Sequence, residues 1–298
     1  MLGKRKDSKP HYPGIPIFYE YLASIQQDKW CFHYLEDTND ISTAKAIRNC
    51  QAKAVSDGSF KYPYGTAATI IEGTTKKERI TAKVITLGEE HDHSSYHSKR
   101  AGIYTTLVLI NHLCAYHNIT EGSIEFACDR LSTLQVIFLN KEVSSKDLDG
   151  DLVMASRMAW MNSPTQWTTR HVAGHQDNNP NHVLDEWEAL NIEADGLAKS
   201  HLSNAATQPR HFKIGLEPWM LWYKAQKLVG IKDSIYNIVH SSIARSYWEK
   251  KEKATVGTID LVHWEAIQQA LKESPRSRKH FIIKHTMGMC GVGRFMQL

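Results

Sequence analysis

The stretch Ala54-Val-Ser-Asp-Gly-Ser-Phe60 has the composition of a short buried strand and carries a carboxylate in its middle. Two further strand-like runs follow at 66–71 and 79–87, and Gly or Pro residues separate the runs. Three consecutive short strands with tight links predict an antiparallel meander. Asp57, the carboxylate in the first strand, would be costly to bury without a partner, so it is a candidate site residue.

Helices and strands alternate after the meander. Apolar residues at helical spacing, among them Leu107 and Ile110, predict a helix over 98–117 that packs on the sheet. The later elements are expected to be a strand at 123–129, a helix through Leu134 and Ile137, a helix at 152–161, a strand at 167–173 and a helix at 185–202. This order predicts an α/β fold in which helices flank a mixed five-stranded sheet.

Three regions are expected along the chain. Residues 1–52 begin with a Pro-punctuated segment and continue through aromatic residues around Trp30, which we interpret as an N-terminal arm or tether that could lie against a domain. Residues 53–203 form the α/β domain. Residues 204–298 are expected to be a basic helical extension, with helices at 221–229, 235–252 and 260–272.

The charge of the chain is unevenly distributed. Lys and Arg number 36 against 32 Asp and Glu, a formal net charge of +4 that does not by itself indicate nucleic acid. Residues 201–298, however, carry 15 Lys or Arg against 7 Asp or Glu, a balance of +8, which leaves −4 for the first 200 residues. A carboxylate-lined site beside a basic segment suits a polyanionic substrate, although an uneven solvated surface is the simpler alternative.

Neither membrane insertion nor a disulfide framework is indicated. No run approaches the roughly 18 apolar residues that a bilayer requires, and the N-terminal charges are not followed by an apolar segment. The 5 cysteines form no closely spaced pair. We therefore expect a soluble, intracellular protein, cytoplasmic or nuclear, without a membrane partner.

Three aspartates are placed where the strands and the last helix can bring them together. Asp57 lies in the first strand, Asp129 at the tip of the fourth and Asp195 in the last helix. Three converging carboxylates repel one another unless cations bind, which suits two Mg²⁺ ions and in-line phosphodiester hydrolysis. Taken singly, each Asp is more often a cap or turn residue. His175 follows a glycine in a loop, where it could shuttle protons or be an ordinary polar loop residue.

Four motifs in order make the chain resemble the type 1 ribonuclease H family, specifically the domains that follow reverse transcriptase in retrotransposon polyproteins. They are Ser56-Asp-Gly-Ser59, Cys128-Asp-Arg130, Ala173-Gly-His-Gln-Asp177 and Asn191-Ile-Glu-Ala-Asp-Gly-Leu-Ala198. The resemblance covers about 53–203. It implies Mg²⁺-dependent (or Mn²⁺-dependent) cleavage of the RNA strand of an RNA–DNA hybrid, and an upstream reverse transcriptase domain as a partner. Asp57, Asp129 and Asp195 would be the metal ligands, and His175 would assist product release.

Candidate substrate contacts are Ser59, Arg130 and Asn191, through hydrogen bonds to phosphate or the ribose 2′-hydroxyl, although each of them could equally be a turn or cap residue. Basic residues of the extension surround an aromatic residue, Phe281, and could grip a nucleic-acid backbone: Arg276, Arg278, Lys279 and Lys284.

One residue departs from the family pattern. Lys99 aligns with the glutamate that the family places in the first turn of the helix after the third strand. At ~4 Å and an effective dielectric constant of ~20, a lysine opposes a neighbouring metal ion by roughly 4 kcal/mol per unit charge. Lys99 would preserve the fold and leave a site able to hold phosphate but poor at activating water. The alternative function is therefore a catalytically inactive nucleic-acid-binding protein, unless Glu89, Glu90 or Asp92 replaces the missing carboxylate.

Two other interpretations stay open at this point. His91, His93 and His97 could form a zinc site, although no cysteine accompanies them and a solvated loop is the simpler interpretation of the segment. A DNA-cutting integrase or transposase on the same fold would also use acidic metal ligands, and fold analogy alone does not separate it from a ribonuclease.

Overall fold

The structure is a computed structural model, and it describes residues 17–205, 221–252 and 263–280 apart from 27, 33, 37–38, 74, 76–78, 89, 140, 145–146, 180 and 224–225. The chain divides into two compact units, Met1–Ile231 and Lys232–Leu298.

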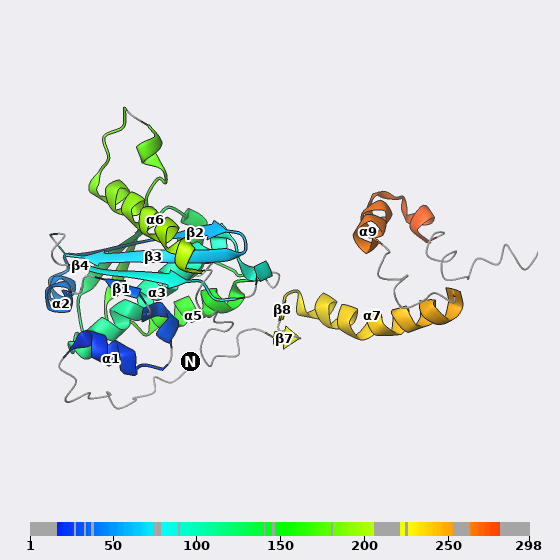
Figure 1. The fold of residues 1–298 in the computed structure, drawn as a ribbon, viewed down its shortest axis with the longest axis horizontal. Coiled ribbons are helices and arrows are strands. Elements are labelled where there is room, and N and C mark those ends of the chain that lie inside the picture. The colour runs from blue at the N-terminus through cyan, green and yellow to red at the C-terminus, as the bar shows by residue number, and fades with distance from the viewer. Residues whose placement is uncertain are drawn as a thin grey trace, which may run out of the picture. The chain divides into compact units, whose positions relative to one another are not determined.

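A six-stranded mixed sheet is the centre of the first unit, with the strand order β1-β4-β3-β2-β5-β6 (Figure 1). The strands are β1 (Tyr34–Glu36), β2 (Ala52–Lys61), β3 (Tyr64–Glu72), β4 (Arg79–Ile85), β5 (Ser123–Cys128) and β6 (Gln166–His171). The predicted meander is confirmed, since β2, β3 and β4 pair antiparallel in sequence order. β5 then pairs parallel with β2, and β6 with β5. The ends of β2 and β5 therefore lie at the same edge of the sheet.

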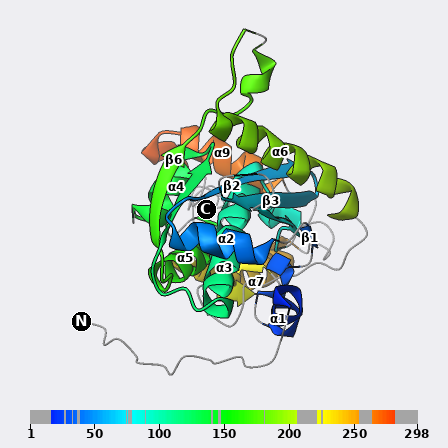
Figure 2. The ribbon, with the colours of Figure 1, turned by 90° about the vertical axis from the view of Figure 1, so that its left-hand side faces the viewer.

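Helices cover both faces of this sheet. The helical elements are α1 (Phe18–Ser24), η1 (Lys29–Phe32), α2 (Asp40–Arg48), η2 (Glu90–Asp92), α3 (Ser95–Tyr116), α4 (Leu131–Phe138), α5 (Gly150–Met161), η3 (Gln176–Asn178) and α6 (Glu186–Ala205). α6 lies on one face and α3 on the other, and the turned view of Figure 2 shows the same layers. The predicted α/β fold, in which helices flank a mixed sheet, is confirmed.

Strand alternation explains how one strand contributes to both layers. Successive side chains of a strand point to opposite faces, so neighbours such as Ala54 and Val55 belong to different cores. Ala54 lies in the core under α3, and Val55 packs with Trp187 and Leu190 in the smaller core under α6. Each fully buried Val or Leu side chain stabilises the fold by about 1.5–3 kcal/mol. β2 is thus fixed from both sides, which holds the residues near its end in place.

The sheet has one strand more than the five predicted. β1 comes from the region interpreted as an arm, and it pairs antiparallel with β4. Aromatic residues of this region are buried against the domain: Trp30 is 5% exposed and stacks on Tyr104 of α3 at 5.8 Å. A three-residue strand is too short to show a hydrophobic period in the sequence. Its formation depends instead on pairing with β4, which lies far along the chain.

The segment that follows residue 220 also differs from expectation. The helix predicted at 221–229 is wrong: β7 (Leu221–Tyr223) and β8 (Gln226–Leu228) pair antiparallel there. Leu-Trp-Tyr favours a strand through its aromatic residues, and a short apolar run does not by itself distinguish helix from strand. In the second unit α7 (Ile231–Glu252) and α9 (Trp264–Glu273) confirm the two later helices. Among the described helices, none has the length and apolar character needed to cross a membrane.

Candidate functional site

The register of two parallel strands brings the first two predicted aspartates together. Val55 of β2 is the partner of Ala127 of β5. Asp57 and Asp129 each lie two residues further along, on the same face of the sheet as this pair. Asp57 is 2% exposed, and the side chain of Asp129 is 11% exposed. Two carboxylates therefore meet at the edge of the sheet with little access to water.

A glycine lets the start of α3 approach these carboxylates. A Cβ added to Gly58 would lie 2.3 Å from the backbone carbon of Ser98 and 2.4 Å from the backbone nitrogen of Lys99. Any other residue would collide with the helix backbone at this distance, so the helix start can pack directly on β2 only because residue 58 is glycine. The first turn of α3 is thereby placed beside Asp57.

Lys99 lies between the two aspartates. Its Nζ donates a hydrogen bond to Asp57 and is 2.6 Å and 2.7 Å from the two carboxylate oxygens of Asp129. Burial alone would lower the pKa of Lys99, but the charges of both aspartates outweigh it, and the pKa lies above its ordinary value. Burial raises the pKa of Asp57, and the ammonium opposes that rise. Lys99 is therefore a protonated cation that bridges two carboxylates.

The third aspartate is also neutralised by a lysine. Asp195 of α6 forms an ion pair of 2.5 Å with Lys199, four residues later on the same helix. His175 Nδ1 is 3.9 Å from an Asp195 oxygen, and the His175 side chain is 60% exposed. His175 has a left-handed backbone with φ of 57°. It follows Gly174, whose added Cβ would lie 2.8 Å from Asp129 Oδ2, so the loop backbone passes directly over the Asp129 carboxylate.

These residues line one pocket with a volume of about 510 Å³. Its walls come from β2, the first turn of α3, the end of β5, the loop before η3 and the middle of α6. The lining residues are Asp57, Gly58, Ser59, Phe60, Ser95, Lys99, Asp129, Arg130, Gly174, His175, Asp195 and Lys199. The three aspartates are thus balanced by Lys99, Arg130 and Lys199, and the formal charge of the wall is zero when His175 is neutral.

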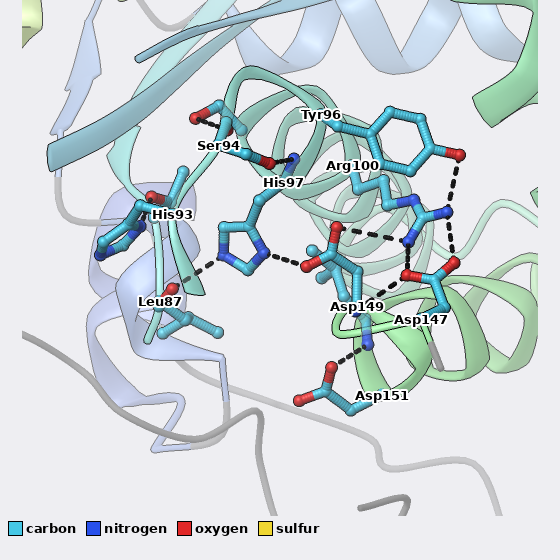
Figure 3. Close-up of polar contacts among 12 residues, drawn as sticks. Leu87, His93, Ser94, Tyr96, His97, Arg100, Asp147, Asp149 and Asp151 are labelled. Atoms are coloured by element: carbon cyan, nitrogen blue, oxygen red, sulfur yellow. Dashed lines mark hydrogen bonds and ion pairs between the residues drawn. The ribbon is translucent and has the colours of Figure 1, made fainter. Parts of the chain in front are cut away.

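A buried polar network fixes the first turn of α3 (Figure 3). His97 Nε2 is 2.8 Å from the carbonyl oxygen of Leu87, and its Nδ1 is 2.5 Å from Asp149. Ser94 caps the helix by accepting a hydrogen bond from the backbone N–H of His97. Both ring nitrogens of His97 thus face acceptors on other segments, which ties the helix start to the end of the sheet and to the start of α5.

Arg100 extends this network to the mouth of the pocket. Its guanidinium, 1% exposed, makes a bidentate pair with Asp147 at 2.7 Å and 2.8 Å and donates to the Tyr96 hydroxyl at 2.7 Å (Figure 3). The guanidinium of Arg130, a pocket-lining residue, lies 5.5 Å from the Tyr96 ring centroid. Tyr96 therefore holds Arg130 over the α3 side of the pocket by a cation–π contact.

The structure brings most of the predicted site residues together. Asp57, Asp129, His175, Asp195, Ser59 and Arg130 all line the pocket, and so does the departing residue Lys99. Asn191 does not line it: its side chain is 2% exposed and lies one turn before Asp195. Its role in substrate binding stays a prediction from sequence. Of the predicted basic residues of the extension, Lys284 and the neighbouring Phe281 lie outside the described residues.

Three pocket residues outside the quoted motifs, Phe60, Ser95 and Lys199, were not predicted as site residues from the sequence. Lys199 carried a usable signal, because an Asp and a Lys at i and i+4 share a helix face. Phe60 ends the first strand, but no local pattern indicates that it faces the pocket.

Among the alternative carboxylates and the proposed zinc ligands, Glu89 and the side chain of His91 lie outside what the structure describes, and the others find no support. Neither Glu90 nor Asp92 lines the pocket. The ring of His93 is 2.9 Å from the Thr86 hydroxyl, and His97 is engaged with Asp149 and Leu87. In the part of the chain that the structure describes, no three His, Cys, Asp or Glu residues are arranged to hold a metal ion.

The residues present do not fit the two-metal site that the resemblance implies. A divalent ion between Asp57 and Asp129 would need the position of the Lys99 ammonium, and at ~4 Å the two cations would repel strongly. Asp195 is likewise engaged by Lys199. The aspartates of the pocket are therefore engaged in internal ion pairs with Lys99 and Lys199.

Comparisons with known proteins give similar structures only. No family model matches the chain, and no curated protein matches it. The RNase H1 of the archaeon Halobacterium salinarum is 16% identical, with 52% of this chain and 98% of that chain covered and a TM-score of 0.36. LC11-RNase H1, solved in complex with an RNA/DNA hybrid, is 12% identical, with 52% and 99% covered and a TM-score of 0.37.

A third similar structure belongs to a larger protein. The protease-reverse transcriptase of prototype foamy virus is 17% identical over 50% of this chain, with a TM-score of 0.32. The match takes up only 20% of that protein. Over about half of its length, the chain is therefore similar to ribonuclease H structures at low sequence identity.

Proposed function

We propose that the chain is a nucleic-acid-binding protein whose pocket holds the backbone of an RNA–DNA hybrid without divalent metal and without cutting it. The observation that carries the proposal is the bridge of Lys99 between Asp57 and Asp129. Two-metal hydrolysis needs carboxylates that are free to bind the ions activating water and stabilising the leaving oxygen. Here an ammonium takes that position.

The charge of the pocket favours phosphate binding in the absence of metal. Three unpaired carboxylates would repel a phosphodiester, but the three cations of the wall cancel them. Arg130 is held at the pocket by Tyr96, so its fork of donors is available to a phosphate at a small cost in side-chain entropy. The +8 balance of residues 201–298 adds long-range attraction for a polyanion.

A Mg²⁺-dependent or Mn²⁺-dependent hybrid ribonuclease is the second candidate. The observation that favours it is the convergence of Asp57, Asp129, Asp195 and His175 on one pocket, as the family resemblance implies. Hydrolysis would require Lys99 to leave the two aspartates when metal arrives. A retroelement origin, with a reverse transcriptase domain upstream, stays a prediction from the same resemblance.

Binding without metal is tested with the full chain and a blunt, fluorescein-labelled RNA–DNA hybrid in EDTA, by anisotropy over a series of salt concentrations. We expect binding that weakens with salt, because each phosphate contact changes the log–log slope by about 0.9. Arg130→Gln should make the slope less steep by about one unit.

Lys45→Gln is the matched control, because Lys45 is an exposed lysine on α2. The last turn of α2 contacts the C-terminal end of α3 through Arg48 and His117, whereas the pocket lies at the first turn of α3. It should leave the slope unchanged. The proposal fails if the hybrid binds only when Mg²⁺ is present, or if the affinity does not depend on salt.

A further inference from the structure

The hairpin that joins β2 to β3 continues the wall of the pocket. Residues 57–60 of β2 line the pocket, and the strand then ends in a two-residue turn formed by Tyr62 and Pro63. Tyr62 is 68% exposed, and Lys61 beside it is also exposed. Phe60 is half-buried and faces the pocket. An aromatic and basic hairpin tip thus extends from the pocket into solvent.

The chemistry of this tip complements a nucleic-acid strand. Among the residues that the structure describes, neither Lys61 nor Arg130 forms an ion pair with a carboxylate, in contrast to Lys99 and Lys199. These two cations are therefore available to phosphates. An exposed aromatic ring stacks on a nucleobase, and cations beside such rings bind the backbone of single strands.

We propose that Tyr62 stacks on an unpaired base of the strand whose phosphate lies in the pocket. This inference rests on the proposed function and narrows its ligand to a hybrid with a single-stranded overhang. Inside a duplex both faces of each base are covered by neighbouring pairs, so away from the duplex ends only an unpaired base offers a face to the ring. Tyr62 is three residues beyond the pocket residue Ser59, which corresponds to on the order of 10 Å along a strand. About three nucleotides stacked at ~3.4 Å would cover this distance between the phosphate in the pocket and the base on Tyr62.

The test compares two hybrids in EDTA, one blunt and one with a six-nucleotide single-stranded overhang, by anisotropy with the full chain. The wild type should bind the overhang hybrid about 5-fold to 100-fold more tightly, the range expected for base stacking on an aromatic ring. Tyr62→Ser should remove this preference and leave the affinity for the blunt hybrid within about twofold. Tyr62→Phe should retain the preference, because the ring and not the hydroxyl makes the contact.

Tyr19→Ser is the matched control. Tyr19 is 53% exposed on α1, which contacts His112 of α3 through Tyr21, about 20 Å along the helix from Lys99. It should not change either affinity. A preference for the overhang that survives Tyr62→Ser overturns the inference, and so does a wild type that binds both hybrids equally; in both cases the proposed function stands. A wild type that binds neither hybrid overturns both.

Discussion

Replacing Lys99 by glutamate should convert the pocket from a set of ion pairs into a metal-dependent site. The substitution removes the cation that contacts Asp57 and Asp129, whose side chains are 2% and 11% exposed. Breaking a buried ion pair costs about 3–5 kcal/mol, because the remaining charges are left uncompensated. The introduced glutamate would add a third carboxylate to this cluster. The Lys99→Glu protein should therefore melt well below the wild type in EDTA.

Divalent metal should recover much of this loss. With 10 mM Mg²⁺ and a dissociation constant of about 0.1 mM, binding to the folded state alone stabilises it by about 2.7 kcal/mol. For a unit of this size that corresponds to an increase in the melting temperature of about 5–10 °C. The wild type, in which Lys99 holds the same position, should change by less than about 1 °C.

The assay is thermal unfolding followed by circular dichroism, in EDTA and in Mg²⁺ or Mn²⁺, for the full chain. Lys99→Met separates the two effects, because it removes the cation without adding a ligand: it should be destabilised and only partly recovered by metal. Lys45→Glu controls for the change in net charge. The reasoning is refuted if Mg²⁺ stabilises the wild type as much as Lys99→Glu, or if Lys99→Glu melts above the wild type in EDTA.

Three further predictions concern the stability of the domain that carries the site. Gly58→Ala should destabilise the fold by about 1–3 kcal/mol, because its Cβ would lie 2.3 Å from the backbone of α3. Gly196→Ala should instead stabilise α6 by about 0.5–1 kcal/mol, because its Cβ would have no other atom within 4 Å. Urea unfolding of both variants checks the contrast. Asp149→Ala should cost about 3–5 kcal/mol, because the buried Arg100 and the imidazole of His97 lose a shared partner; unchanged urea unfolding would contradict this. Burial lowers the pKa of His112 to about 4. As the pH falls below about 6.5, His112 therefore becomes protonated in the unfolded chain but stays neutral in the folded state. The free energy of unfolding is thus highest above pH 6.5 and decreases as the pH falls towards 4, by about 3 kcal/mol in all. His112→Gln should flatten the pH dependence of urea unfolding across that window, and an unaltered profile would show that another group is responsible.

Local patterns were sufficient for the elements that carry the site. Asp57 and Asp129 could be predicted as neighbours because β2 and β5 are strands whose ends meet at one edge. Lys99 could be recognised as a departure, because its place in the first turn of a helix follows from the resemblance. The contact of Lys99 with both aspartates additionally needs the close approach at Gly58, which only the packed structure shows.

The features that sequence analysis missed depend on contacts between distant segments. β1 is a strand because it pairs with the edge of β4. The three residues of β1 carry no sequence pattern that predicts this pairing. The prediction of a helix at 221–229 was wrong because a short apolar run is compatible with both the helical and the strand periodicity. The contact of Arg130 with Tyr96 joins the end of β5 to the start of α3. No hydrophobic periodicity in the sequence predicts a side-chain contact of this kind.

The most direct test of the central claim is a cleavage assay on a hybrid that the wild-type protein is shown to bind. The RNA strand is end-labelled, protein is added above the dissociation constant, and products are separated on a denaturing gel after incubation with Mg²⁺ or Mn²⁺. The account predicts that the RNA stays intact while the hybrid remains bound in EDTA and in metal alike. Cleavage by the wild type that requires metal and disappears in Asp129→Asn would contradict it, because it would show that Lys99 does not keep metal from the aspartates.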